Sequence, residues 1–376
     1  MDASALSLAA YRVARPLLFR FDPERIHRLT IRGLRVAGED RIGRLLLGQV
    51  GAGPRDPEPV RVAGMALRNR IGLGAGFDKD GVALRGWAAL GLGFVEVGTV
   101  TPLPQPGNPP LRLFRLKADG ALINRMGFNN AGAAELARHV MLARPHLPGG
   151  FAVGVNIGRG RDTPPEAAAD DYAAAFRLVA PVADYVTVNI SSPNTPGLRS
   201  MQSSGTVAAL LTVLAEVGQH LNAPRPIFVK LAPDLDDETL CALAAAAADS
   251  GAAGLVLANT TLGRRGLTAA RDVRDQAGGL SGRPLLPRAR EAVGLVRAAL
   301  GGRLAIIASG GVESGRDAAA LIAAGADLVQ LWTGLVFRGP GLIGESIRAT
   351  AGAGPSTPGT TGLAAGLPGH DARLLR

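Results

Sequence analysis

The feature that most constrains the fold is an alternation of short apolar runs with alanine-rich helical stretches, which begins near residue 60. Eight runs have the length and β-branched content of buried strands. They are RIGLGAG (70–76), FVEVGTV (94–100), FAVGVNI (151–157), YVTVNIS (185–191), PIFVKLA (226–232), GLVLANT (254–260), LAIIASG (304–310) and LVQLWTG (328–334). Helical stretches separate or follow them, near residues 80–90, 130–143, 166–180, 205–220, 236–249, 287–300, 315–324 and 340–350. Eight such units favour an α/β fold of the closed (β/α)8 (TIM) barrel type over an open doubly wound sheet.

Two segments flank the predicted barrel domain of residues 51–350. Residues 1–50 predict amphipathic helices over 4–19 and from about 23 to 37, the second with Asp22 as N-cap and Pro23 in its first turn. This extension carries nine arginines against five acidic residues and lacks the features of a secretory signal. It fits either a helical cap on the barrel or a helical pair lying on an anionic membrane. Residues 351–376, rich in Gly, Pro, Ser and Thr, read as a flexible tail.

Composition narrows the function classes. The sequence contains no uninterrupted run of 18 or more apolar residues, so no membrane-spanning helix is expected. The single cysteine, Cys241, excludes a disulfide framework and a cysteine-ligated metal site. The net charge of +10 is built from 41 basic residues, of which only Lys79, Lys117 and Lys230 are lysines. That charge suits nucleic acid, an anionic membrane or anionic small ligands, and a rare lysine indicates a task that arginine does not perform.

Polar residues gather where the predicted strands end, which is where (β/α)8 barrels place their active sites. They are Lys79, Thr99, Asn156, Asn189, Ser191, Ser192, Asn194, Thr195, Lys230, Asn259, Thr260, Thr261, Ser309, Gly310, Gly311, Trp332, Thr333 and Gly334. A long excursion after the second strand contains INRMGFNN (123–130). The five histidines (27, 139, 146, 220 and 370) lie away from these strand ends, so no histidine triad and no metal site is expected.

This set of residue types suggests a ligand. Converging asparagines offer donors and acceptors to a planar amide or imide, and the lysines offer charge to an anion. Glycines after the last two strands are the usual phosphate site of such barrels. The set therefore predicts a phosphorylated cofactor and a small anionic heterocycle. The turn GLGAGF (72–77) does not match the dinucleotide fingerprint, which argues against a Rossmann fold.

A series of segments, in order along most of the chain, resembles the class 2, quinone-linked dihydroorotate dehydrogenases. The most specific are NISSPNTPGLR (189–199) and GGLSGRPL (278–285), and others include FDPERIH (21–27), GLGAGFDKDG (72–81), EVGTVTP (96–102), INRMGFNN (123–130), VKLAPDL (229–235) and LVQLWTG (328–334). The resemblance implies oxidation of (S)-dihydroorotate to orotate in de novo pyrimidine biosynthesis. It also implies one FMN per chain as hydride acceptor and a membrane quinone as final acceptor.

The resemblance assigns roles to individual residues. Ser192 would be the general base, passing its proton onward, by hypothesis through Thr195 and water, and Lys230 would lie beside the N1/O2 edge of the flavin. The implied substrate contacts are Lys79, Asn124, Arg125, Met126, Gly127, Phe128, Asn189, Asn194, Asn259 and Thr260. The implied FMN contacts are Ala75, Gly76, Phe77, Asp78, Lys79, Thr99, Asn156, Asn189, Lys230, Ala258, Gly282, Gly311, Trp332 and Thr333. His27 and Arg115 match positions near the quinone tunnel. A monomer peripheral to the cytoplasmic face of the inner membrane, without nucleic acid, is expected.

Class 1 relatives use a cysteine as base, whereas Cys241 lies on the predicted helix after the fifth strand, so the serine supports class 2. Three residues depart from the family pattern: Ala258 stands for a frequent Thr, Ser309 for Gly and Trp332 for Tyr. These changes bear on FMN binding.

Two alternatives are a different flavin barrel, such as a dihydrouridine synthase that binds tRNA, and a basic nucleic-acid- or membrane-binding protein on a degenerate barrel. The first does not account for NISSPNTPG, and the complete set of polar strand ends argues against the second.

Overall fold

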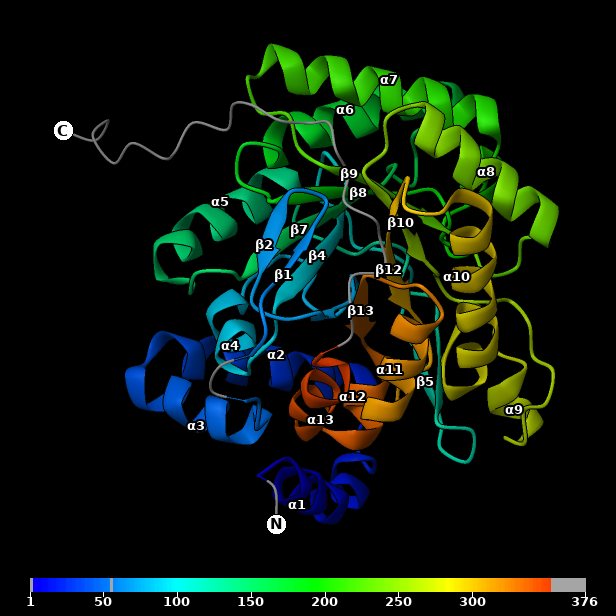
Figure 1. Cartoon of the computed structure of the whole chain (residues 1–376). Helices are drawn as coiled ribbons and strands as arrows, with labels where there is room; N and C mark the ends of the chain where they lie inside the picture. Colours follow the sequence, from blue (N-terminus) through cyan, green and yellow to red (C-terminus); the bar gives the residue numbers. More distant parts are fainter. Residues whose placement is uncertain (1–2, 55–56, 353–376) are drawn as a thin grey trace.

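The protein is described by a computed structural model over residues 3–54 and 57–352. Eight parallel strands close into a barrel, which confirms the predicted (β/α)8 fold and excludes the open sheet (Figure 1). In their order around the barrel the strands are β10 (Gly254–Leu257), β12 (Ala305–Ser309), β13 (Leu328–Leu331), β3 (Ile71–Leu73), β4 (Phe94–Val100), β7 (Ala152–Ile157), β8 (Tyr185–Asn189) and β9 (Ile227–Leu231). Most end before the predicted runs do, and the residues that follow β3, β10, β12 and β13 in those runs leave the ladder and line the mouth of the barrel.

Helices cover the outside of the barrel. The predicted ones are α4 (Leu84–Ala89), α5 (Ala133–Ala143), α6 (Ala168–Val179), α7 (Ser204–His220), α8 (Asp237–Asp249), α10 (Leu286–Leu300), α11 (Gly315–Ala323) and α13 (Gly341–Thr350). Two short helices were not predicted, α9 (Arg271–Arg274) and α12 (Thr333–Arg338). Several helices begin at a side-chain cap: Ser203, Asp236 and Ser314 each accept a hydrogen bond from the backbone of the first turn.

A hairpin closes the end of the barrel opposite the mouth. Its strands, β1 (Val60–Val62) and β2 (Met65–Leu67), pair in antiparallel fashion across a two-residue turn. Both turn residues, Ala63 and Gly64, have positive φ (47° and 79°), as the tightest hairpins require. Apolar side chains of the hairpin pack against the lowest inward-facing residues of the barrel strands, among them Phe94 and Tyr185. The sequence analysis missed this hairpin, which leaves the mouth as the open end.

A second small sheet lies beside the mouth. Its antiparallel strands are β5 (Leu113–Leu116), β6 (Ala121–Asn124) and β11 (Gly279–Gly282). It joins two chain segments that are about 150 residues apart, with Gly279 paired to Asn124. The long excursion after the second barrel strand, for which no strands were predicted, therefore forms part of the wall of the mouth.

Three helices precede the barrel: α1 (Ala3–Leu18), α2 (Pro23–Glu39) and α3 (Arg41–Gly51). The first two were predicted, and Asp22 caps α2 as expected by accepting a hydrogen bond from the backbone N of Arg25 at 2.8 Å. The third was not predicted. Gly38 of α2 and Gly86 of α4 pack so closely that a Cβ on Gly38 would lie 2.5 Å from the Gly86 nitrogen. The helices thus contact the barrel side of the molecule directly.

Within residues 3–54 and 57–352, no helix is long and apolar enough to cross a membrane. The division at residue 50 into an extension and a barrel domain stays a prediction, although α3 ends at Gly51. Almost all of the predicted flexible tail, from residue 353 onward, lies outside the described residues.

Candidate active site

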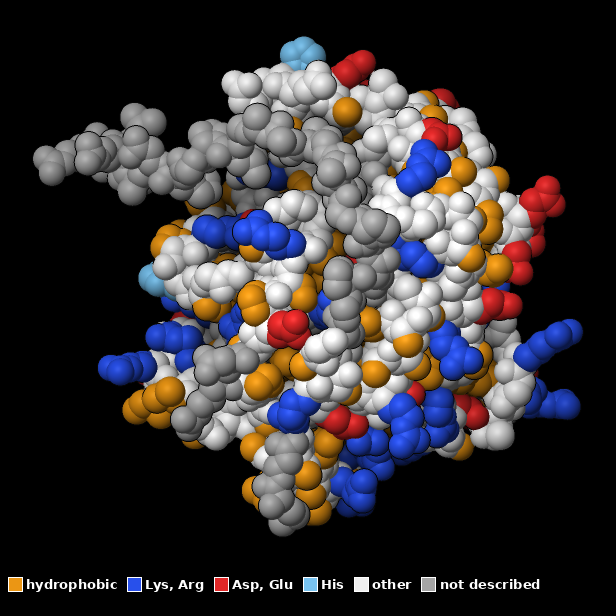
Figure 2. All heavy atoms as spheres, viewed as in Figure 1, with side chains coloured by type: hydrophobic (Ala, Val, Ile, Leu, Met, Phe, Trp, Pro, Cys, Tyr) orange, Lys and Arg blue, Asp and Glu red, His pale blue; other side chains and the backbone are white. Residues whose placement is uncertain are grey.

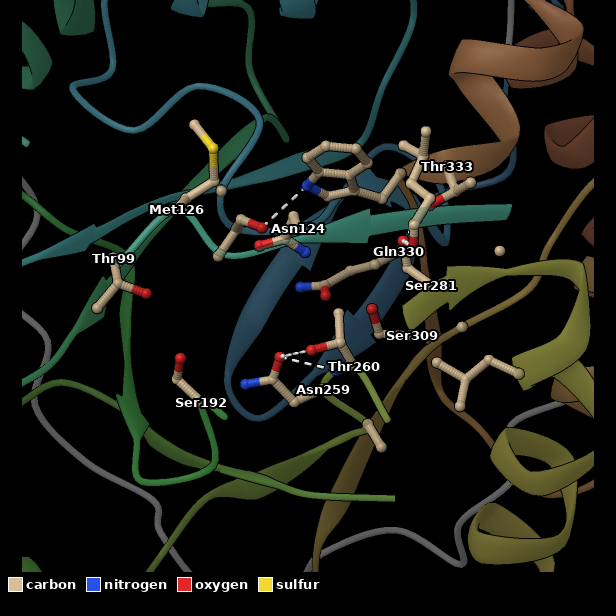
Figure 3. A pocket seen from close by; sticks show the side chains of 18 of the residues that line it. Thr99, Asn124, Met126, Ser192, Asn259, Thr260, Ser281, Ser309, Gln330 and Thr333 are labelled. Carbon is tan, nitrogen blue, oxygen red and sulfur yellow. Dashed lines mark hydrogen bonds between the residues drawn. The ribbon is translucent and has the colours of Figure 1, made fainter. Parts of the chain in front are cut away.

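A pocket lies at the carboxyl ends of the barrel strands and is also bordered by the small sheet (Figure 3). It brings together most of the residues that the sequence analysis assigned to substrate or cofactor. Those that line it are Ala75, Gly76, Lys79, Thr99, Asn124, Met126, Gly127, Phe128, Asn189, Ser192, Asn194, Lys230, Ala258, Asn259, Thr260, Gly282, Gly311, Trp332 and Thr333. In Figure 3, Ser192, which follows β8, and Asn259 and Thr260, which follow β10, face a common space.

Four residues assigned to contacts lie behind this lining: Phe77, Asp78, Arg125 and Asn156. Asn156 is fully buried next to Thr99, whose hydroxyl donates to its Oδ1 at 2.5 Å. The Asp78 carboxylate accepts hydrogen bonds from the backbone just before α4. The guanidinium of Arg125 bonds to the segment before β11. The geometry gives Asp78 and Arg125 supporting positions, and their contacts with a ligand stay predictions.

Ser192 stands on the loop after β8 and is 5% exposed, so the hydroxyl is almost dry. Its Oγ accepts a hydrogen bond from the backbone N–H of Asn194 at 3.2 Å. Arg199 fixes the same loop to its neighbours: it donates to the backbone carbonyl of the residue before Ser192 at 3.1 Å, to the carbonyl of Thr260 at 2.9 Å and to the Asp234 carboxylate at 2.8 Å. The serine is therefore held in position by contacts from three strand-end loops.

Side-chain amides form the floor and one side of the pocket. Asn189 lies at their centre, since its Nδ2 donates to Asn156 Oδ1 at 3.1 Å and its Oδ1 accepts from Asn259 Nδ2 at 3.2 Å. On the opposite side, Asn194 Nδ2 donates to Asn124 Oδ1 at 3.3 Å. Because amides carry both donors and acceptors, this group can match the alternating C=O and N–H groups of a planar ring.

Two lysines supply positive charge. Lys230 is the penultimate residue of β9 and is 6% exposed, and burial lowers the pKa of its ammonium while the charge of Glu96 opposes that shift. Burial also lowers the pKa of Lys79, to about 8, and the positive charge of Arg112 adds to the effect. No salt bridge or hydrogen bond joins either ammonium to another residue of the described chain. Both are thus available to an anionic ligand.

Glycine-rich backbone forms the pocket wall near β11 and β12. Gly282 and Gly311 have positive φ (103° and 76°), and a Cβ on Gly311 would lie 2.5 Å from the backbone nitrogen of Leu286. Nearby, Thr333 Oγ1 donates to Ser281 Oγ at 2.8 Å. Close backbone approach with hydroxyls is the arrangement expected at a phosphate.

The sequence analysis missed several lining residues, including Leu113, Leu122, Ser281, Leu285, Val312 and Gln330. Gln330 could have been found, because it lies one strand period before Trp332 and must face the same way. All three departures from the family pattern border the pocket: Ala258 and Ser309 as small side chains, and Trp332 through an indole that donates to the Ala75 carbonyl at 3.0 Å. Trp332 is therefore fixed in place without the hydroxyl of the usual tyrosine.

A second, apolar cavity of about 410 Å³ lies between the N-terminal helices and the barrel. It shares His27, Leu113, Leu122 and Trp332 with the polar pocket. Arg115 lines the apolar cavity but not the polar pocket. The expectation that every histidine lies away from the mouth is wrong for His27, because α2 carries it to the common wall of the two cavities. Burial, together with the charge of Lys79, lowers the pKa of His27 to about 4, so the imidazole is neutral near pH 7.

In the described part of the chain, no three His, Cys, Asp or Glu side chains are grouped as a metal site would need. A polar pocket with a dry serine and two ammonium groups, at the mouth of a (β/α)8 barrel and next to an apolar cavity, defines an enzyme acting on small molecules.

Comparison with known proteins makes the assignment specific. The family model described as dihydroorotate dehydrogenase matches residues 59–349. A relative from Burkholderia thailandensis is 47% identical over 91% of this chain and 97% of its own length, and one from Akkermansia muciniphila is 46% identical over 92% and 97%; both are named dihydroorotate dehydrogenase (quinone). The crystal structure of DHODH from Eimeria tenella in complex with ferulenol matches with a TM-score of 0.79 at 35% identity, over 87% of this chain and 90% of that one. The chain belongs to the dihydroorotate dehydrogenase family, in its quinone-dependent class 2.

Proposed function

We propose that this chain oxidises dihydroorotate to orotate in pyrimidine biosynthesis and passes the electrons to a quinone. The observation that carries the proposal is the pocket at the barrel mouth, where amides, a buried serine and two ammonium groups suit a small planar anion. Family membership supports the same reaction, since relatives that are 47% identical over 91% of the chain are named for it.

FMN is the cofactor that the family implies, and the residues present fit it. The buried ammonium of Lys230 suits an electron-rich ring edge, and the backbone at Gly282 and Gly311 suits a phosphate. Thr99 and Thr333 add hydroxyls on either side. When bound there, the flavin supplies a two-electron acceptor for the substrate. The positive charge of Lys230 would favour negative charge that develops on the ligand beside it.

Ser192 is the proposed general base: its Oγ takes the proton from C5 of dihydroorotate and passes its own proton onward, by the proposed route through Thr195 and water. An alcohol is a weak base, so its oxygen needs stabilisation as charge develops on it. The backbone N–H of Asn194 already donates to Ser192 Oγ at 3.2 Å. This hydrogen bond would strengthen as negative charge develops on Oγ while the hydroxyl proton leaves. The nearly dry surroundings of the hydroxyl increase the effect.

The asparagines and Lys79 would hold the substrate against the serine. Asn189 and Asn194 belong to the end of β8 that also carries Ser192, and Asn259 follows β10, so hydrogen bonds from these amides would fix the orientation of a planar ring. Lys79 stands on the turn after β3, where its ammonium can pair with the substrate carboxylate. Binding, orientation and proton removal are thus assigned to separate groups.

The apolar cavity is the proposed quinone site. Its lining is almost wholly aliphatic and aromatic, which suits a quinone ring with an isoprenoid chain. His27 and Arg115 are the polar groups best placed for the quinone oxygens, and the Arg115 guanidinium also donates to the Phe21 carbonyl at 2.8 Å. Since His27 and Trp332 border both cavities, the quinone would lie one side chain away from the polar pocket.

The N-terminal helices are the proposed contact with the membrane surface, on its cytoplasmic face. Ten of the seventeen exposed large hydrophobic side chains in the described ranges belong to residues 6–50, including Val13 (82% exposed) and Ile42 (67% exposed). Figure 2 shows hydrophobic and basic side chains together on the end of the molecule formed by α1 and α3. An apolar surface with nearby positive charge suits an anionic bilayer, from which a quinone could enter the apolar cavity.

Turnover by the flavin-loaded enzyme tests the reaction. Dihydroorotate should reduce a short-chain quinone, and fumarate or NAD should not replace the quinone. Ser192→Ala should bind orotate normally but lose turnover by at least about a hundredfold, whereas Ser200→Ala on the exposed part of the same loop should behave as wild type. Quinone reduction absent from wild type refutes the proposed activity, and near-normal turnover by Ser192→Ala refutes the assignment of the base.

Membrane contact is tested by sedimentation with phosphatidylcholine vesicles, with and without phosphatidylglycerol. Wild type should bind most to the anionic vesicles. The double substitution Val13→Glu/Leu17→Glu should abolish binding, and Leu178→Glu, which changes an exposed apolar residue on α6, should not. Equal binding by all three proteins contradicts the proposed surface.

A further inference from the structure

One carboxylate lies inside the barrel, beneath the polar pocket. Glu96 of β4 is completely buried and accepts hydrogen bonds from four side chains. Asn156 Nδ2 donates to its Oε1 at 2.8 Å, while Gln330 Nε2 (2.8 Å), Thr187 Oγ1 (3.1 Å) and the Tyr185 hydroxyl (3.3 Å) donate to its Oε2. Each of these neighbours supplies a donor, and an ionised carboxylate, which only accepts, is the matching partner.

A line of amides runs from this carboxylate to the substrate side of the pocket. Asn156 donates to Glu96 and accepts at its Oδ1 from Asn189 Nδ2 (3.1 Å). Asn189 in turn accepts at its Oδ1 from Asn259 Nδ2 (3.2 Å), and Asn259 Oδ1 accepts from the backbone N–H of Thr260 (2.8 Å). Every amide in the line thus donates toward Glu96 and accepts on its other side.

The two ends of the line decide this direction, and the backbone N–H of Ser191, which donates to Asn189 Oδ1 at 3.3 Å, supports it in the middle. The nitrogen and oxygen of an amide occupy nearly the same space, so an asparagine alone could face either way. Glu96 can only accept and the Thr260 N–H can only donate, so reversing any one amide would bring two donors or two acceptors together in a buried site. The carboxylate therefore fixes Asn156 directly and, together with the backbone donors at Asn189 and Asn259, sets which face of each amide remains for a ligand.

Gln330 is held by the same rule. Because its Nε2 donates to Glu96, its Oε1 is turned the other way, and Figure 3 shows the amide reaching toward the middle of the pocket. That oxygen is buried and has no hydrogen-bond partner among the described residues. A buried acceptor without a partner at a pocket wall is suited to an N–H or O–H of a bound molecule.

We propose that Glu96 is a positioning residue that sets the donor and acceptor pattern of the pocket floor, through Asn156 for the substrate amides and through Gln330 for an additional ligand contact. This inference rests on the proposed function, because its test measures the binding of orotate to the pocket. Glu96 itself is fully buried and is not among the residues that line the pocket.

A charge-swapped pair of substitutions tests the line. Glu96→Gln keeps the shape, and its NH2 group should take the Oε1 position opposite Asn156, because the Oε2 position faces three donors. Asn156 must then turn round, and Asn189 loses its acceptor on Asn156 and keeps only Thr99 Oγ1. In Glu96→Gln/Asn156→Asp the new amide donates to the new carboxylate, which accepts from Asn189 as before. The pattern from Asn189 onward is then restored.

Orotate affinity of the flavin-loaded proteins is the measurement, with flavin content and thermal unfolding recorded in parallel. Glu96→Gln should weaken orotate binding by at least about tenfold, and the swapped pair should recover it to within about threefold. Asp327→Asn is the matched control, because Asp327 is a buried carboxylate before β13, at the opposite end of that strand from the pocket. It should lower the unfolding temperature and leave orotate affinity unchanged.

A separate variant tests the second contact. Gln330→Met removes the unpartnered oxygen and should weaken the binding of orotate or FMN by at least about fivefold. Wild-type affinity for both ligands removes Gln330 from the proposal.

The results separate this proposal from the proposed function. If wild type fails to bind orotate or to turn over dihydroorotate, the function is wrong. If wild type is active and Glu96→Gln binds orotate equally well, or the folded swapped pair stays weak, the positioning role is overturned. Should Glu96→Gln fail to fold, the swapped pair alone decides by its affinity.

Discussion

The protonation of Lys79 should set the pH range in which the pocket binds its anionic substrate. Burial lowers the pKa of its ammonium from 10.5 to about 8, and Arg112 contributes in the same direction. The charged form attracts the carboxylate of orotate, whereas the neutral amine does not. Binding should therefore be strongest below about pH 8 and should weaken as the pH rises through that value.

The size of the effect follows from that pKa. The protonated fraction of Lys79 falls from about 0.9 at pH 7 to about 0.1 at pH 9, so affinity for orotate should fall by about tenfold over this range. At pH 8 about half of the molecules must gain a proton when they bind the anion, so about 0.5 proton is taken up per orotate.

Calorimetric titration of orotate into the flavin-loaded enzyme measures both quantities, when it is repeated in two buffers with different ionisation enthalpies. Lys79→Met should bind weakly and show no change attributable to this group between pH 7 and 9. Lys117→Met, which changes a lysine in the turn between β5 and β6, should titrate like wild type. The reasoning is refuted if wild type and Lys79→Met lose affinity in parallel, or if wild type takes up no proton at pH 8.

Three further outcomes are expected. Gly311→Ala should lose most of its flavin, because the new Cβ would lie 2.5 Å from the Leu286 nitrogen, whereas Gly205→Ala, with open space around it, should keep a full complement; absorbance of the purified proteins decides. Arg199→Met frees the loop of Ser192, the proposed base, so kcat should fall by about tenfold with a smaller change in orotate affinity, and an equal loss in both would contradict a positioning role. His27, with a pKa of about 4, should add no titration to the KM for quinone between about pH 5.5 and 8, as comparison with His27→Gln will show.

The barrel could be predicted from the sequence because each of its strands and helices has a recognisable pattern within its own short segment. Runs such as FVEVGTV and LVQLWTG carry the composition of buried strands, and their alternation with helices defines the fold class. The sequence did not predict β1 and β2, because three-residue strands joined by Ala63 and Gly64 carry too little periodicity. The small sheet was missed for another reason: β11 pairs with a strand about 150 residues earlier, and no local pattern records that pairing.

Some residues of the candidate site could likewise be predicted from the sequence, and others could not. Residues at the ends of predicted strands, such as Ser192, Lys230 and Asn259, could be placed at the mouth from strand direction alone. His27 could not be placed there by the same reasoning, because it reaches the mouth from a helix that only tertiary packing brings close. Glu96 opens the motif EVGTVTP, but its positioning role could not be predicted from the sequence. The side chains that donate hydrogen bonds to it come from β7, β8 and β13, which are distant along the chain.

The hairpin that closes the far end of the barrel has a practical consequence. Its turn, Ala63–Gly64, lies at the opposite end of the barrel from the polar pocket, and neither residue lines the polar pocket or the apolar cavity. A side chain on Gly64 would be strained at its φ of 79°, whereas the exposed Arg61, beside the turn on β1, already carries one that can be replaced. A fluorophore or a surface tether attached at this position would therefore hold the enzyme with its mouth directed outward, so that ligand arrival could be followed on single immobilised molecules.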